Sequence, residues 1–220
     1  MPPPATDALV DAYLDLKDVV IQRGFGRELF WQERAARLPL TEPRFLREGA
    51  WVILSSGMSY RAVSRRFGGV ASALGNLRSG RAVVRAGEVG RRRALQAFNH
   101  EGKIDAITAL GRHLNDEGLA EVQKGLQDDP VRYLQRFSYL GPATAAHLAK
   151  NLGAPIAKPD RHLIRIADAA GFSSVGALCK AIADAVGDPV PVVDLVAWRH
   201  ATLDSDYLTA WRRAALSSAG

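Results

Sequence analysis

Residues 137–166 read FSYLGPATAAHLAKNLGAPIAKPDRHLIRI, and the rest of the chain is best understood outward from this stretch. Its pattern predicts a helix, a tight turn at Leu140-Gly141-Pro142, a second helix, a short loop, and a third helix that begins at Asp160. A turn with glycine at this place leaves backbone N–H groups at the start of the second helix, where the helix dipole favours an anion. The stretch is therefore suited to hold a phosphate group and to present one carboxylate beside it.

Both features also have a purely structural interpretation. The Leu140-Gly141-Pro142 turn is equally compatible with an ordinary connection between two packed helices. Asp160 precedes an apolar helix, and aspartate is among the best N-cap residues in any protein. The turn and Asp160 alone do not distinguish a phosphate-binding site from an ordinary helix connection with an N-cap, so the rest of the sequence is needed.

Composition describes an ordinary globular chain with a basic balance. The 220 residues carry 29 Lys plus Arg against 23 Asp plus Glu, a formal net charge of +6, which favours polyanionic partners. The one cysteine, Cys179, excludes an intramolecular disulfide and a cysteine-held metal or iron–sulfur cluster. With five scattered histidines, we expect no metal held by side chains and no cofactor.

The chain has no feature that suggests a membrane or secretion. Its first residues lack the basic start and apolar core of a signal peptide, and no apolar run reaches the roughly 20 residues that span a bilayer. We therefore expect a soluble, cytoplasmic protein without membrane contact, associated with the nucleoid if it is bacterial, and a monomer.

Apolar residues recur at helical spacing along nearly the whole chain, so the predicted fold class is all-α. Thr6 or Asp7, Ser59 and Asp128 or Asp129 are the predicted caps of three helices. The predicted helices include 45–55, 60–67 (ended by Gly68-Gly69), 103–115, 130–137, 161–170, 175–186 and 192–216. From Val70 to Gly90 the pattern is weaker, Gly-rich and basic.

The order of these segments resembles the endonuclease III-like DNA glycosylases, the helix-hairpin-helix (HhH-GPD) superfamily. That family has a Leu-Pro-Gly-Val-Gly-like turn followed by Thr-Ala, and then Val-Asp-x-His-Val-x-Arg-Val, which Asp160 to Ile166 resembles. Residues 53–59 stand where the family has Leu-Leu-Ser-x-Gln-Thr/Ala-x, and 103–114 resemble its Lys-Ala-x-x-Ile-x-x-Leu helix. The resemblance extends over about residues 45–170.

The resemblance implies a two-lobed helical fold with a cleft between the lobes. One lobe would be a barrel-like bundle, 45–152, that ends in the helix-hairpin-helix at about 131–151. The other lobe would combine 1–44 with 153–220 and carry the catalytic aspartate. The implied partner is double-stranded DNA that contains a damaged or mismatched base.

Family members flip a base out of DNA and cleave its N-glycosidic bond, and a carboxylate stabilises the cation-like sugar. Asp160 stands at the position of this carboxylate. Bifunctional members have a lysine nucleophile directly before the hairpin Thr, where this chain has Ala143. The resemblance therefore implies a monofunctional hydrolase in base excision repair, with alkylated bases as one substrate class.

Further residues follow from the same resemblance and from residue type. The predicted DNA-binding residues are Tyr139, Leu140, Gly141, Pro142, Ala143, Thr144, Lys150, Arg61 and Arg65. The predicted base-pocket or wedge residues are Met58, Gly57, Tyr60, Trp31, His100, Lys158 and Trp198. Family hairpins also hold a monovalent cation through backbone carbonyls. For the aromatic residues and Met58, burial in the core is the competing interpretation, and the basic region 61–93 could be a solvated surface.

Two other functions stay open at this point. Lys158 or Lys150 could act as the amine nucleophile of a bifunctional glycosylase/AP lyase, with Lys150 facing solvent or a phosphate. The chain could also be a non-catalytic helix-hairpin-helix protein that only binds DNA. The sequence leaves the target base open.

Overall fold

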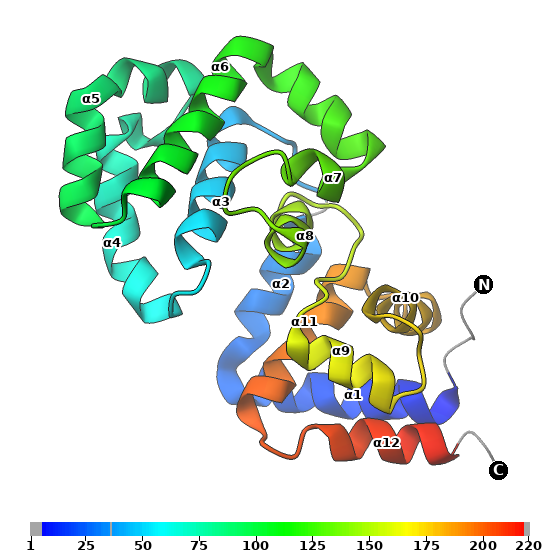
Figure 1. Ribbon diagram of the computed structural model, residues 1–220. Coiled ribbons are helices and arrows are strands. Elements are labelled where there is room, and N and C mark those ends of the chain that lie inside the picture. The colour runs from blue at the N-terminus through cyan, green and yellow to red at the C-terminus, as the bar shows by residue number, and fades with distance from the viewer. Residues whose placement is uncertain (1–5, 36, 218–220) are drawn as a thin grey trace. The chain divides into compact units, whose positions relative to one another are not determined.

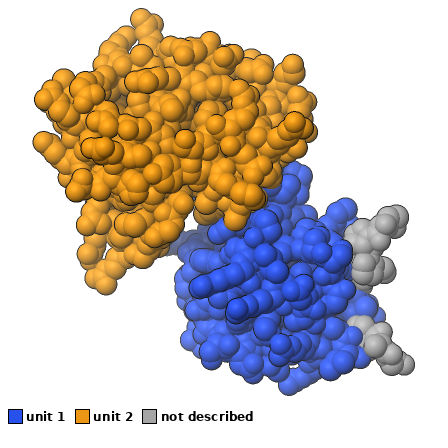
Figure 2. Space-filling view, viewed as in Figure 1, with its two compact units in different colours: residues 1–38, 153–220 blue, residues 39–152 orange. Residues whose placement is uncertain are grey.

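The computed structural model describes residues 6–35 and 37–217, and every regular element within these ranges is helical (Figure 1). The predicted all-α fold class is therefore confirmed for the described part of the chain. The chain forms two compact units, 1–38 with 153–220 and 39–152 (Figure 2). We call them unit 1 and unit 2.

Unit 2 is a continuous segment of the chain. It contains α3 (Glu42–Ser55), α4 (Tyr60–Ala73), a short 3-10 turn η2 (Gly75–Leu77), α5 (Gly80–Ala97), α6 (Glu101–Asp128), α7 (Pro130–Leu134) and α8 (Pro142–Asn151). The long α6 packs against both α3 and α5, as Figure 1 shows. The core of unit 2 is built from fully buried apolar side chains, among them Phe45, Leu46, Ile53, Ile104 and Leu110.

Unit 1 joins the two ends of the chain. It contains α1 (Asp7–Val20), a π-helical turn η1 (Ile21–Phe25), α2 (Gly26–Ala35), α9 (Arg161–Ala169), α10 (Val175–Val186), α11 (Val190–Leu203) and α12 (Leu208–Ser217). A single core contains Tyr13, Ile166, Cys179, Val193 and Trp211.

A buried tyrosine and a partly buried ion pair connect the first helix of unit 1 to the loop before α11. The Tyr13 hydroxyl donates to Asp188 over 2.6 Å, and Lys17 pairs with the same carboxylate at 2.7 Å. Burial raises the pKa of the Tyr13 hydroxyl, and the hydrogen bond to Asp188 raises it further. The phenol therefore stays protonated and keeps donating.

Several helix starts lie where the sequence places them, since a short polar side chain caps each one. Thr6 accepts from the N–H of Leu9, Ser59 from Ala62, and Asp129 from Arg132. α3 begins earlier than the predicted Phe45, because Thr41 caps it and Pro43 occupies its first turn. The boundary between the units accordingly falls between residues 38 and 39, and not between 44 and 45 as the sequence suggested.

Other predicted helix ends are wrong. α4 continues through Gly68-Gly69, because Gly69 packs against Ala97 of α5 where a larger residue would collide. The weakly patterned stretch after it is mostly helical, with a break at Gly87. α6 is kinked at Gly118, whose φ is 81°, so its first part ends close to the predicted residue 115. Conversely, α7 ends at Leu134. The helical region predicted over 192–216 contains two helices, α11 and α12.

Candidate functional site

The predicted turn between α7 and α8 is present in unit 2, and its backbone is unusual. Tyr139 has a φ of 67°, in the left-handed region that rarely suits a side chain other than glycine or asparagine. Gly141 is the N-cap of α8 and Pro142 follows it, so no side chain caps this helix. The N–H groups of Ala143 and Thr144 lie in the first turn of α8, where they are available to an anion.

Thr144 holds the turn together from inside. Its hydroxyl lies 3.0 Å from the carbonyl oxygen of Tyr139 and 3.1 Å from that of Gly141. Two carbonyl oxygens of the turn therefore converge on one point. The Thr144 hydroxyl occupies that point, and the monovalent cation expected at the hairpin carbonyls stays a prediction. Leu140 turns inward and is buried, which anchors the turn to the core of unit 2.

The ring of Tyr139 connects the turn to the start of α6. It meets the His100 ring edge to face, with centroids 5.7 Å apart. It also lies against Gly102, where any added Cβ would overlap the Tyr139 hydroxyl. The side chain that replaces the usual hairpin glycine is therefore packed in place, and it remains partly exposed.

Lys103 is the central residue of this region, and sequence reasoning missed it. Its side chain is 3% exposed, and its ammonium donates to the carbonyl oxygens of Leu54 at 2.8 Å and Ser56 at 2.6 Å. The same ammonium lies 6.0 Å from the Tyr139 ring centroid and 5.8 Å from that of Phe98. Burial lowers the pKa of Lys103, and the two carbonyls compensate part of the cost of burying its charge.

The carbonyls that Lys103 binds belong to the end of α3, directly before Gly57 and Met58. One buried cation therefore connects the hairpin ring to the loop that carries the predicted wedge. The signal in the sequence was the lysine that opens 103–114, which indicated only a helix resemblance there. Its partners lie about fifty residues away in sequence, so no local pattern could reveal them.

Met58 and His100 line one cavity of about 360 Å³, together with Arg66, Phe98 and Asn99. Met58 is 42% exposed, so it is not a core residue, and Gly57 before it has a φ of 68°. The walls are mostly apolar, and the polar groups are the Arg66 guanidinium, the Asn99 amide and the His100 imidazole. This cavity suits a flat ring with polar edges, and it joins two residues that the sequence predicted for a base pocket.

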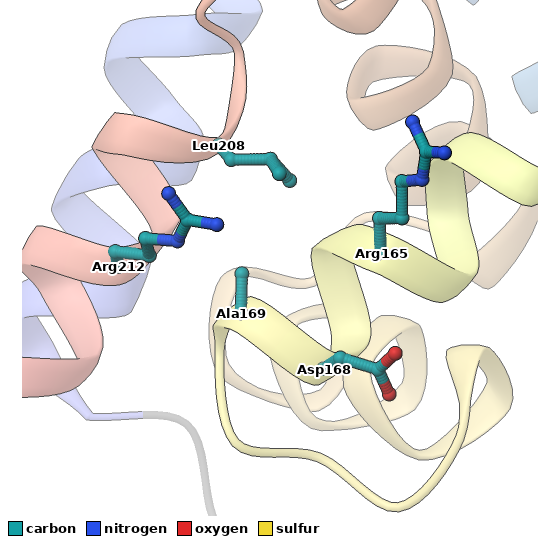
Figure 3. Close-up of a pocket in the computed structure, with 5 residues that line it drawn as sticks. All are labelled: Arg165, Asp168, Ala169, Leu208 and Arg212. Carbon is teal, nitrogen blue, oxygen red and sulfur yellow. The ribbon is translucent and has the colours of Figure 1, made fainter.

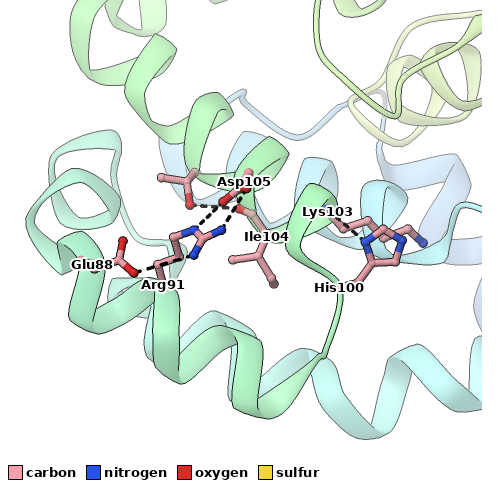
Figure 4. Close-up of polar contacts among 7 residues, drawn as sticks. Glu88, Arg91, His100, Lys103, Ile104 and Asp105 are labelled. Atoms are coloured by element: carbon pink, nitrogen blue, oxygen red, sulfur yellow. Dashed lines mark hydrogen bonds and ion pairs between the residues drawn. The ribbon is translucent and has the colours of Figure 1, made fainter.

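His100 has a structural role as well as a place in this cavity. Its Nδ1 accepts from the backbone N–H of Lys103 at 3.4 Å, so it caps α6 (Figure 4). Beside it, Arg91 of α5 pairs with Asp105 of α6 at 2.6 Å and lies 3.7 Å from Glu88. The Arg91 guanidinium lowers the pKa of the Asp105 carboxyl through this hydrogen bond. The start of α6 is therefore held on two sides.

The predicted basic contacts on α4 face solvent. Arg61 and Arg65 are both exposed and lie one helical turn apart. Tyr60, at the start of the helix, is 74% exposed and meets the Trp51 ring with centroids 5.6 Å apart. Unlike core aromatics, it is free to contact a ligand.

The structure contradicts the prediction that Lys150 faces solvent or binds a phosphate. Its side chain is only 5% exposed, so it neither faces solvent nor offers its charge to a phosphate. The physical reason is its position on α8, whose last turns pack into unit 2: the neighbouring Leu148, Ala149 and Asn151 are buried too.

Asp160 belongs to unit 1, where it caps α9. Its Oδ1 accepts from the N–H groups of His162 at 3.0 Å and Leu163 at 3.1 Å. Its other oxygen, Oδ2, lies 3.7 Å from the Lys158 ammonium, and the Asp160 side chain is 14% exposed. The N-cap interpretation is therefore correct for one oxygen, while the second oxygen keeps lone pairs for another partner.

A second carboxylate, that of Asp194, holds the loop that carries Lys158 and Asp160. Asp194 is 1% exposed and accepts from the backbone N–H of Lys158 at 2.5 Å. It lies inside α11 rather than at its start, so it is not a helix cap. The Lys158 carbonyl in turn accepts from the N–H of Asp160 at 2.9 Å. This chain of contacts fixes Lys158 and Asp160 side by side.

The other predicted residues of unit 1 differ in their surroundings. Trp31 on α2 is exposed, so it is available for stacking. Trp198 on α11 is half-buried against the core, and the Arg199 guanidinium lies 4.7 Å from the centroid of its ring. An incoming base would have to share or displace that contact.

Within unit 2 the structure therefore brings together Met58, His100, Tyr139 and the unforeseen Lys103. Within unit 1 it brings together Asp160, Lys158 and Asp194. Chemically, the first group can contact an aromatic ring, and the second can stabilise a positive charge or supply an amine.

Comparisons with protein-family models, with curated proteins and with solved structures found no match to this chain. In the described residues, no three His, Cys, Asp or Glu side chains are grouped as metal ligands. No helix in the same part of the chain has the length and apolar character needed to cross a membrane.

Proposed function

We propose that this protein is a monofunctional DNA glycosylase with the two-lobed HhH-GPD fold, which binds damaged double-stranded DNA and hydrolyses an N-glycosidic bond. The observation that carries the proposal is the state of Asp160. It is a carboxylate whose Oδ1 is fixed by two backbone N–H groups, while its Oδ2 lies 3.7 Å from the Lys158 ammonium and can accept a further hydrogen bond.

The reaction explains why such a carboxylate is useful. As the base leaves, the sugar develops positive charge, and a fixed anion stabilises that charge without having to reorganise. In this role Asp160 forms no covalent bond with the sugar. Water is the attacking group: Asp160 takes one of its protons, the hydroxide oxygen bonds to C1′ of the sugar, and the base leaves with the electron pair of the broken C1′–N bond.

The hairpin supports the DNA part of the proposal. An uncapped helix start with two N–H groups in its first turn binds a phosphodiester well, and such contacts fix the protein on the backbone without reading sequence. Exposed Arg61 and Arg65 add charge to the same unit. The cavity lined by Met58 and His100 offers a place for a ring removed from the base stack.

The experiment that tests this function is a panel of duplexes, each with one lesion, including alkylated, deaminated, oxidised and mismatched bases. We expect abasic sites in at least one duplex and unbroken strands until alkali is added. Release of no base from any duplex would refute the enzyme and leave a DNA-binding module.

One observation favours a second candidate, a glycosylase with lyase activity. The Lys158 ammonium lies 3.7 Å from Asp160, so an amine is already beside the carboxylate, whereas Lys150 is buried. Borohydride would trap a Schiff base between Lys158 and the sugar. Trapping that is lost in Lys158→Met would establish this candidate, and absence of trapping beside base release supports the monofunctional one.

A further inference from the structure

Unit 1 has a second cavity that the proposed reaction does not use. It measures about 610 Å³ and is lined by Arg165, Asp168 and Ala169 of α9 and by Leu208 and Arg212 of α12 (Figure 3). None of these residues was a predicted contact. The two helices pack against each other, so the cavity belongs to one rigid part of unit 1.

Two exposed guanidinium groups line this cavity. Within the described residues, neither Arg165 nor Arg212 has a hydrogen bond or ion pair. In the view of Figure 3, Arg212 extends toward α9, while the guanidinium of Arg165 and the carboxylate of Asp168 point away from α12. Two cations lining one cavity with a single carboxylate leave a net positive charge, which an anion would neutralise.

The volume and the lining residues of this cavity indicate which class of anion it fits. Guanidinium groups match the oxygens of a phosphate through two parallel N–H bonds, which a bare halide or a single carbonyl cannot use. Ala169 and Leu208 add an apolar surface between the two arginines. The volume of about 610 Å³ exceeds a phosphate ion and falls in the range of pockets for small organic ligands.

We propose that Arg165 and Arg212 form a binding site for the phosphate group of a nucleotide, with the sugar or base against Ala169 and Leu208. The nucleotide is either a free nucleoside monophosphate or a unit of a DNA strand. This site is separate from the proposed glycosylase reaction, since it needs neither Asp160 nor the hairpin.

The first test uses the full chain at low ionic strength, titrated with 2′-deoxyadenosine 5′-monophosphate by calorimetry and followed by NMR. We expect saturable binding that shifts the signals of Ala169 and Leu208, and no binding of 2′-deoxyadenosine, which lacks the phosphate. Arg165→Gln and Arg212→Gln should each weaken binding about tenfold, the loss expected for a charge-assisted contact.

Two further variants make this result specific. Lys180→Gln removes the same charge from the exposed surface of α10, where Lys180 pairs only with Asp184, and should leave binding unchanged. Asp168→Asn removes the one anion that lines the cavity and should tighten binding. Thermal unfolding of each variant verifies that it is folded.

DNA binding distinguishes the two sources of the phosphate. If the cavity holds a DNA phosphate, the Arg165→Gln/Arg212→Gln double variant lowers duplex affinity and reduces the slope of log K against log salt by about 0.9 for each lost phosphate contact. If it holds a free nucleotide, duplex binding is unchanged while mononucleotide binding is lost. The proposal is overturned if both ligands bind the double variant as well as wild type, or if Asp168→Asn weakens binding.

A failed glycosylase would leave this result intact, because the readouts are binding and chemical shift rather than base release. A failed nucleotide site would likewise leave base release by Asp160 untouched.

Discussion

The ammonium group of Lys103 donates to the carbonyl oxygen of Ser56 over 2.6 Å, and this contact ties the start of α6 to the end of α3. Ser56 immediately precedes Gly57 and Met58, and the same ammonium faces the ring of Tyr139 at 6.0 Å. The loop that carries the candidate wedge and the turn of the hairpin are thus held by one buried charge. Neither could shift without disturbing the other's contacts.

Replacing Lys103 should destabilise unit 2. Lys103→Met keeps much of the aliphatic volume but leaves the carbonyls of Leu54 and Ser56 without their donor, at a cost of about 3 kcal/mol. Urea unfolding measures the difference, and Lys124→Met, an exposed site on α6, is the control that should cost little. Equal stability of the two variants would mean that the buried charge contributes nothing.

Two glycines in helices should respond in opposite ways to alanine. A Cβ at Gly125 of α6 would overlap the buried ring of Tyr133 on α7, so Gly125→Ala should cost about 2 kcal/mol. Gly68 of α4 has open space around it, and Gly68→Ala should gain about 1 kcal/mol from helix propensity. Unfolding curves of both variants test the packing of α7 on α6. A stabilising Gly125→Ala would show that Tyr133 does not pack there.

Acid should weaken the same region through His113. Burial lowers the pKa of His113 from 6.5, with Arg136 adding to the effect, and its Nε2 lies 2.7 Å from the Tyr133 hydroxyl. Between its lowered pKa and 6.5 the unfolded chain binds this proton more readily, so stability rises with pH there and is lost as the pH falls below 6.5.

The measurement is the free energy of unfolding of wild type and His113→Gln across mildly acidic pH. We expect the variant to lose less stability than wild type as the pH falls. Parallel pH profiles would show that His113 is not the group responsible, since His200, whose pKa burial also lowers, is present in both proteins.

A substitution at the start of α8 should weaken DNA binding without weakening the fold. Ala143→Asp adds a negative charge at an uncapped helix start, which stabilises the helix by about 0.5 kcal/mol but repels a phosphate. We expect duplex affinity to fall about tenfold with the melting temperature kept. Gly176→Asp places the same charge in the first turn of α10, which Ser174 already caps, and should leave affinity nearly unchanged. An equal loss of duplex affinity in both variants would mean that the added negative charge acts through the net charge of the protein and not through the start of α8.

The local rules of helix capping predicted much of this fold. Thr6, Ser59, Asp129 and Asp160 each cap the helix that follows them, because a short acceptor before an apolar helix has few other uses. The same rules failed at Gly68-Gly69, where glycine serves the close approach of α4 to α5 and does not end a helix. A local pattern cannot distinguish those two uses of glycine.

The parts of the candidate site that depend on neighbouring residues in the sequence could be predicted. The parts that depend on burial in the folded chain could not. Asp160 and the hairpin turn stand out from neighbouring residues alone. Lys103 and Lys150 are both buried lysines, and nothing in their flanking sequence announces it. Asp194 became informative only when its contact to the Lys158 backbone was seen, because that contact spans 36 residues.

The most direct test of the central claim is base release by Asp160→Asn, measured as single-turnover abasic-site formation in the best duplex of the lesion panel. Asparagine is as good an N-cap as aspartate, so α9 should stay folded and DNA binding should be kept. Because the neutral amide cannot stabilise a cationic sugar, we expect the rate to fall by roughly a hundredfold or more. A variant that releases the base at the wild-type rate would contradict the role of Asp160 in the reaction.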